Sequence, residues 1–156
     1  MPIKGLKDNA VKTSVAQLNA RLADMLALKL ALKQAHWNVK GPGFIAVHEL
    51  LDAVAGRSEE QTDTMAERIQ ALGGVALGTA EVVAAGATVK AYPTDLVSEK
   101  DHIEAICARI ADLGGKVREA IAQVTDAGDD GTADIFVGVS RQLDKDMWFL
   151  ESHLGR

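Results

Sequence analysis

Apolar residues recur three or four positions apart along most of the chain, which is the spacing of an amphipathic helix. We expect four long helices, over residues 11–39, 43–71, from 98 to about 125, and 132–153. The apolar positions that define the first two are Leu18, Leu22, Met25 and Leu32, then Phe44, Val47, Leu51, Val54, Met65, Ile69 and Leu72. Those of the last two are Ile103, Ile106, Ile110, Leu113, Val117 and Ile121, then Phe136, Val139, Leu143, Met147 and Leu150. The letters SVAQ at 14–17 resemble a capping box near the start of the first helix.

Turn-forming residues separate these stretches. KGPG at 40–43 ends the first helix, a glycine pair at 73–74 ends the second, and DAGDDG at 126–131 ends the third. Residues 73–97 form a long link, in which we expect one short helix near 79–85. Because the first two helices and the last two are joined by short turns, each pair should be antiparallel. The predicted fold is therefore all-α: a four-helix bundle that runs up-down-down-up with one long crossover, as in ferritin-like proteins.

The composition suits one folded domain in a reducing compartment. The chain has 156 residues, of which 47% are hydrophobic, so we expect a single domain over 1–156 with a mobile N-terminal tail over 1–10. No apolar run approaches the roughly 20 residues of a membrane span, and the N-terminus lacks the apolar segment of a signal peptide. The single cysteine, Cys107, excludes an intrachain disulfide. The cytoplasm is the expected location, no membrane partner is expected, and the net charge of −5 favours a cation over a polyanion as partner.

Four candidate metal ligands share one face of the second helix: His48, Asp52, Asp63 and Glu67. At about 100° per residue they fall within an arc of roughly 100°, well away from the apolar stripe of the same helix. The first two are one turn apart, as are the last two, so each pair can share one ion. The two pairs are separated by eleven residues, or roughly 16 Å along the axis, whereas metal–ligand bonds are about 2 to 2.5 Å long. One ion therefore cannot join both pairs within one helix.

Two arrangements remain open for these pairs. They form two separate half-sites, or two copies of the helix pack antiparallel across a two-fold axis and bring unlike pairs together. Small residues on or beside this face, Ala55, Gly56 and Ala66, would let two helices approach closely. His36, near the end of the first helix, can add a ligand. A simpler interpretation also stands: carboxylates are common on solvated helix faces, and His36 continues the apolar stripe as a core histidine would.

The stretch AHWNVKGPGFIAVHELLDAVAGRSEEQTDTMAERIQALGG, which begins at residue 35, carries a more specific pattern. Its His-x11-His-x3-Asp-x10-Asp-x3-Glu spacing, together with DDGTADIFVGVSRQLDKDMWFLESHL near the C-terminus, closely resembles the Dps proteins, the mini-ferritins that protect bacteria from peroxide. The resemblance implies an inter-subunit ferroxidase centre, whose ligands would be His36, His48, Asp52, Asp63 and Glu67. It implies a hollow homododecamer, built from two-fold dimers, that oxidises ferrous iron with hydrogen peroxide in preference to dioxygen and stores ferric oxide. The ligand types suit iron, although alone they do not exclude zinc or manganese.

Other residues match family positions with less specific signals. Trp37 matches a tryptophan thought to take up a stray oxidising equivalent, and an aromatic anchor for the turn is an equally open interpretation. Asp126, Asp130 and Asp134 match acidic positions of ion-entry pores, where a ring of carboxylates draws ferrous iron inward. Ordinary helix capping is the alternative for these aspartates. Trp148 is expected in the core.

The sequence leaves open whether DNA is a partner. Many Dps proteins bind DNA through a mobile terminal tail rich in lysine and arginine. Here the N-terminal segment offers Lys4, Lys7 and Lys12, offset by Asp8. Three lysines per chain are modest, but twelve copies would multiply their effect. An ordinary soluble tail is the simpler interpretation.

The leading functional hypothesis is a peroxide-dependent ferroxidase and iron-storage cage. One rival is a DNA-compacting structural protein whose metal site mainly supports assembly, and another is a non-enzymatic four-helix interaction module. A di-iron centre inside the bundle is disfavoured, because such centres use two Glu-x-x-His motifs and this chain has one, from Glu99 to His102.

Overall fold

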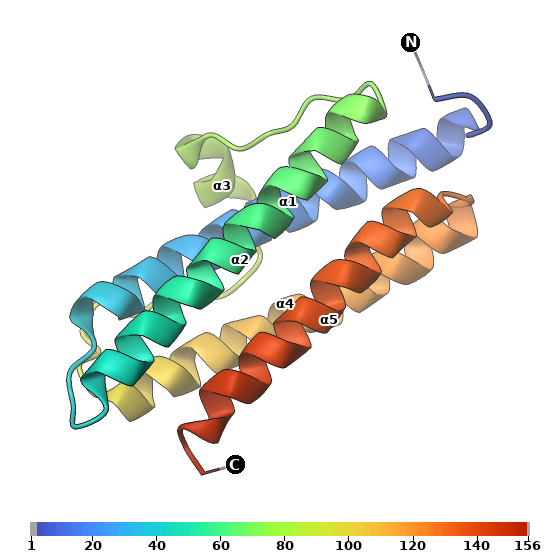
Figure 1. Cartoon of the computed structure of the whole chain (residues 1–156). Helices are drawn as coiled ribbons and strands as arrows, with labels where there is room; N and C mark the ends of the chain where they lie inside the picture. Colours follow the sequence, from blue (N-terminus) through green and yellow to red (C-terminus); the bar gives the residue numbers. More distant parts are fainter. Residues whose placement is uncertain (1–2, 156) are drawn as a thin grey trace.

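The computed structural model describes residues 3–155 and confirms the all-α prediction. The described part of the chain forms four long helices and one short helix (Figure 1). Their bounds are α1 Asp8–Asn38, α2 Phe44–Ala71, α3 Ala80–Gly86, α4 Glu99–Ala127 and α5 Asp130–Ser152. No helix within residues 3–155 combines the length and the apolar character that crossing a lipid bilayer requires.

The four long helices form a bundle with the predicted up-down-down-up order. Helices α1 and α2 pack as an antiparallel pair, as do α4 and α5, and the pairs meet through α1 against α4 and α2 against α5 (Figure 1). The long crossover leads from the end of α2 back to the start of α4, and its short helix α3 packs on α1. The turn between α1 and α2 lies at one end of the bundle, and the turn between α4 and α5 lies at the other.

The predicted apolar stripes form the core. The largest fully buried side chains come from all four long helices and include Leu18, Leu32, Leu51, Ile69, Ile110, Leu113 and Phe136. Their removal from water is the main stabilising contribution to the bundle. Two residues are exceptions to the prediction: Trp148 is 62% exposed on α5, and Phe44, the first residue of α2, is 38% exposed.

The N-terminal boundary differs from the prediction. Helix α1 begins at Asp8 rather than at residue 11, so it takes in the last three residues of the expected tail 1–10. Ile3 and Leu6 are partly buried against the core, and the first two residues of the expected tail lie outside the described residues. The capping box predicted at 14–17 is therefore wrong: Ser14 lies inside α1, fully buried, and caps nothing in its own helix.

Ser14 instead belongs to a buried cluster that ties three helices together. Its hydroxyl donates to Asp129 Oδ2 at 2.7 Å. Asp129 is the N-cap of α5, where it accepts from the Thr132 N–H, and it pairs with Arg68 of α2 at 2.7 Å. Burial alone would raise the pKa of Asp129, but the hydrogen bonds from Thr132 and Ser14, together with the Arg68 guanidinium, hold the pKa below its ordinary value.

The other helix ends follow local rules that the sequence displays. The Ser98 side chain caps α4 by accepting from the Asp101 N–H at 3.1 Å. Helix α4 ends at Gly128, whose φ of 94° lies in the left-handed region that glycine adopts without strain. The short helix expected near 79–85 occurs as α3.

Two contacts fasten the crossover and the α1–α2 turn. Asp24 of α1 is fully buried and accepts from the backbone N–H groups of Thr88 and Val89. At the other end of the crossover, the Lys40 N–H donates to the Val97 carbonyl at 2.9 Å. These bonds hold the crossover along α1 and fix the turn from which α2 starts.

Candidate metal centre

His36 and His48 form a reciprocal pair across the α1–α2 turn. The Nδ1 atom of His36 lies 2.9 Å from the His48 carbonyl oxygen, and Nδ1 of His48 lies 2.8 Å from the His36 carbonyl oxygen. The rings stack with centroids 3.7 Å apart and planes inclined by 22°. The His36 carbonyl is one of the last four of α1, which receive no hydrogen bond from an N–H group within the helix. The His48 ring therefore also supplies the donor that this carbonyl lacks at the end of α1.

This pairing determines which ring nitrogens are free to bind a metal. A carbonyl oxygen can only accept, so each Nδ1 must carry the hydrogen. In the neutral imidazole the lone pair then resides on Nε2, the form in which histidine is a metal ligand. Donation of the second ring N–H to a carbonyl is also the usual way in which a metal-binding histidine is oriented. Both histidines are therefore preorganised as Nε2 donors, and His36 is half-buried rather than a core residue.

Asp52 lies one turn beyond His48 and is paired with a lysine. Its side chain is 55% exposed, and the Lys33 Nζ atom lies 2.6 Å from its Oδ1 atom. The hydrogen bond from Lys33 is the largest effect on the pKa of Asp52 and holds it below its ordinary value, against a smaller opposing effect of desolvation. Lys33 was not among the residues predicted from the sequence, although its position one turn before His36 and Trp37 places it beside them on α1.

Asp63 and Glu67 lie further along α2 and are both exposed. The structure does not bring them to the histidines. Among residues 3–155, no three or more His, Cys, Asp or Glu side chains gather closely enough to hold one ion. Within one chain, the five candidate ligands are thus two separate groups on α1 and α2, as the axial spacing required.

Comparisons with known proteins decide the family. The ferritin-like domain family matches residues 15–156. A DNA protection during starvation protein of Agrobacterium fabrum is 48% identical over 149 residues, which span 96% of this chain and 92% of that protein. The chain belongs to the Dps proteins of the ferritin-like family.

Solved structures agree with this assignment. DpsC from Streptomyces coelicolor superimposes with a TM-score of 0.94 at 34% identity, covering 99% of this chain and 90% of that one. Dps from Microbacterium arborescens, solved in a high-iron form, gives a TM-score of 0.89 at 34% identity and covers 96% of this chain and 97% of that one. The Dps resemblance inferred from the sequence is confirmed.

The remaining candidate residues of this Dps chain lie on its surface. Trp37 is 66% exposed, with the Lys33 ammonium 5.7 Å from its ring centroid. The aspartates assigned to a pore, Asp126, Asp130 and Asp134, are exposed near the α4–α5 turn, at the opposite end of the bundle from the histidines. Between them in sequence lies Asp129, whose buried structural role was not apparent from the sequence. The three lysines of the N-terminal segment, Lys4, Lys7 and Lys12, are exposed.

The interior of the bundle offers no alternative centre among the described residues. Glu99 packs under the α1–α2 turn, where a Cβ atom at Gly41 would lie 2.5 Å from its Cδ atom, while His102 Nδ1 meets the Tyr92 hydroxyl at 2.7 Å. Glu99 and His102 of the single Glu-x-x-His motif therefore contact different parts of the chain and do not form a metal site together.

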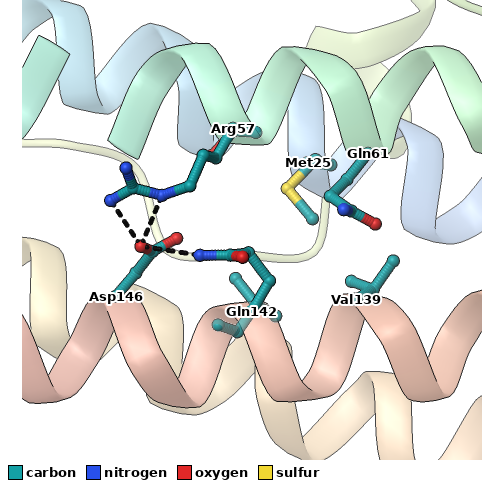
Figure 2. A pocket seen from close by; sticks show the side chains of 8 residues that line it. Met25, Arg57, Gln61, Val139, Gln142 and Asp146 are labelled. Carbon is teal, nitrogen blue, oxygen red and sulfur yellow. Dashed lines mark hydrogen bonds and ion pairs between the residues drawn. The ribbon is translucent and has the colours of Figure 1, made fainter. Parts of the chain in front are cut away.

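A small pocket between α2 and α5 has Asp146 as its one carboxylate (Figure 2). Arg57 of α2 forms an ion pair with that carboxylate, and Gln142, one turn earlier on α5, donates a hydrogen bond to it. Burial raises the pKa of Asp146, outweighing the opposing hydrogen bonds from Arg57 and Gln142. A cation-paired, buried carboxyl group is unsuited to a second cation, so the surface groups on α1 and α2 remain the candidate metal ligands.

Proposed function

We propose that this Dps chain oxidises ferrous iron with hydrogen peroxide at centres shared between two copies, and stores the ferric product inside a hollow dodecamer. The observation that carries the proposal is the division of the ligands. His36 and His48 are preorganised at the α1–α2 turn, with Asp52 one turn further along α2, and the Asp63–Glu67 pair lies on the same face of α2 but too far away to complete a site with them. A two-fold axis across α2 would supply each group with its missing half.

The exposed apolar side chains next to the histidines support such a dimer. Leu30 and Trp37 lie two turns apart on one face of α1, and Ile45 lies one turn before His48 on α2. Each is at least 60% exposed, which is a large exposure for apolar residues of this size. A groove between α1 and the crossover continues this surface and is lined mostly by alanine, valine and aromatic side chains. Burial of this surface against a second copy would remove it from water and bring the α2 helices together.

The donor set suits ferrous iron as a substrate. Two neutral imidazole nitrogens and three carboxylates form a mixed nitrogen–oxygen site that accepts first-row divalent metals. Two ferrous ions each give up one electron to one peroxide, the O–O bond breaks, and both oxygens leave as water or hydroxide. Because both electrons are supplied together, no hydroxyl radical is released. The Dps protein of Microbacterium arborescens was solved in a high-iron form, which supports iron as the substrate here.

The surface aspartates near the α4–α5 turn fit this proposal as an entry route. Asp126, Asp130 and Asp134 are exposed at one end of the bundle, where a three-fold axis of the dodecamer would gather them into a ring that attracts divalent cations. We also propose that the protein works in the cytoplasm, since such chemistry consumes ferrous iron.

The experiment that tests the proposal follows ferric absorbance after anaerobic loading with ferrous iron and addition of peroxide, with assembly checked by light scattering. We expect rapid oxidation with two irons consumed per peroxide, and slower oxidation when dioxygen replaces peroxide. An intact assembly that oxidises iron no faster than buffer would contradict the proposal.

DNA binding is the second candidate function, and two observations favour it. Three exposed lysines stand within the first twelve residues, and the Agrobacterium fabrum relative carries the name DNA protection during starvation protein. We expect a mobility shift of linear DNA at low salt that is abolished by replacing Lys4, Lys7 and Lys12 with glutamine, because phosphate contacts are electrostatic. A shift that persists in the triple variant, or that is insensitive to salt, would exclude this segment as the contact.

A further inference from the structure

A surface pocket of about 360 Å³ between the crossover and α4 gathers cationic side chains. Its lining consists of Thr88 and Lys90 from the crossover and Ala108, Arg109, Asp112 and Lys116 from α4. Three of these side chains are cationic and one is anionic, although the whole chain has a net charge of −5. The pocket is therefore a local excess of positive charge in an acidic protein.

The innermost cation of this pocket, Arg109, is 5% exposed. Three of the five N–H groups of its guanidinium donate to the carbonyl oxygens of Lys90, Ala91 and Ala105. The guanidinium carbon also lies 4.8 Å from the centroid of the Tyr92 ring. These contacts fasten the crossover to α4 and stabilise the cation through dipoles and an aromatic face, but they bring no negative charge to it.

A buried arginine without a carboxylate partner is unusual, because buried charges are normally paired. Arg21, the other buried arginine of the described chain, follows the rule and pairs with Asp24 at 3.0 Å. Burial lowers the pKa of Arg109, with a smaller opposing effect of Tyr92, but a guanidinium stays charged in proteins. The remaining two N–H groups of Arg109 have no hydrogen-bond partner within residues 3–155. An anion from solution can supply what the chain does not.

Two lysines add to the charge of the pocket. Lys90 is exposed, and its ammonium has no ion pair within the described part of the chain. The Lys116 ammonium donates to the Thr88 carbonyl at 2.9 Å and pairs with Asp112 at 2.7 Å. One carboxylate thus stands against three cations. A phosphate group carries a charge of about −1.5 to −2 near neutral pH, which matches the excess, and guanidinium and ammonium groups are its usual donors.

We propose that this pocket binds a phosphate group, held by Lys90, Lys116 and the unpartnered N–H groups of Arg109. The volume of the pocket equals that of roughly ten water molecules at about 30 Å³ each, which leaves room for one phosphate group. The group belongs to a nucleic-acid backbone or is free inorganic phosphate, since both present the same anionic oxygens. The inference does not rest on the proposed iron chemistry, whose candidate ligands lie on α1 and α2.

The first experiment titrates the assembled, iron-free protein with inorganic phosphate by calorimetry in a chloride buffer of low ionic strength. Lys90→Gln should weaken phosphate binding about three- to tenfold, because one charge-assisted hydrogen bond is lost. Asp112→Asn should tighten binding by a similar factor of about three to ten, because it removes the carboxylate that competes for the cations. The Lys90 side chain has no hydrogen bond or ion pair among the described residues, so its replacement leaves the fold intact.

Two matched controls lie on α4 outside the pocket. Lys100 and Glu119 are exposed and do not line it, so Lys100→Gln and Glu119→Gln should bind phosphate as the wild type does. If these controls shift the affinity as much as the pocket variants do, the effect is one of overall charge and the proposal is overturned.

Linear double-stranded DNA distinguishes the two sources of the phosphate. For a backbone phosphate, Lys90→Gln/Lys116→Gln should bind DNA more weakly than the wild type, and its salt dependence should fall by about two phosphate contacts. For free phosphate, the double variant should bind DNA as the wild type does and lose affinity for inorganic phosphate alone. Unchanged affinity of the double variant for both inorganic phosphate and DNA would overturn the proposal.

Discussion

Replacing His48 and Asp52 together by alanine is expected to slow peroxide-driven iron oxidation by at least about 100-fold, to the rate in buffer. The two side chains provide a preorganised Nε2 donor and an adjacent carboxylate. Without them, the remaining carboxylates of the partner copy have no nitrogen ligand from α2. Stopped-flow ferric absorbance measures the loss, and light scattering confirms that the variant still assembles.

The matched control removes one histidine and one carboxylate elsewhere. His153 and Glu119 are both exposed and lie off the α2 face, so His153→Ala/Glu119→Ala should retain the wild-type rate. Equal activity of all three proteins would show that oxidation occurs away from the proposed centre.

The second large effect concerns stability. Asp129→Ala should lower the free energy of unfolding by about 3 kcal/mol, as expected when one member of a buried ion pair is removed. Asp129 is 1% exposed, and its loss leaves the Nη2 group of Arg68 and the Ser14 hydroxyl without this acceptor. Denaturant unfolding at fixed protein concentration measures the change, because assembly also contributes to apparent stability. Asp130→Ala, at the next and exposed position, should change stability by less than about 0.5 kcal/mol.

The Asp129 contribution should depend on pH with a defined sign. Since the pKa of this carboxyl group is lowered in the folded protein from an ordinary value of 3.8, folding favours its charged form. Its stabilisation is fully present above the unfolded pKa and is lost as pH falls through the folded pKa. The difference between wild type and Asp129→Ala should therefore be constant near neutral pH and shrink below about pH 3.8. A difference that grows on acidification would contradict the assigned charge state.

The part of the fold predictable from sequence was the part governed by local signals. Ser98 and Gly128 cap the two ends of α4 through contacts within one turn of that helix. Their identity in the sequence is therefore enough to place both ends. Ser14 was wrongly predicted as a cap because its partner Asp129 lies 115 positions away in the sequence. A serine before a polar residue resembles a cap, and only the packing of α1 against the α4–α5 turn reveals its actual acceptor.

The candidate site divides in the same way. The helical period alone places the four candidate ligands of α2 on one face and shows that the two pairs cannot meet within one chain. It could not supply the contacts from α1, because the rotation of α1 about its axis depends on tertiary packing. The reciprocal His36–His48 bonds and the Lys33–Asp52 pair became visible only when that packing was known.

Complementation between two inactive variants tests the shared centre most directly. One variant carries His48→Ala/Asp52→Ala and the other Asp63→Ala/Glu67→Ala; each alone should lack activity, since every centre of its dimer is incomplete. In a mixed dimer, one centre receives both intact halves and the other receives none. After equal amounts are dissociated and reassembled at random, half of the dimers are mixed, so about a quarter of the wild-type iron oxidation should return. If native mass spectrometry shows mixed dimers and the activity stays at the level of the parents, the centre is not shared between copies and the account is wrong.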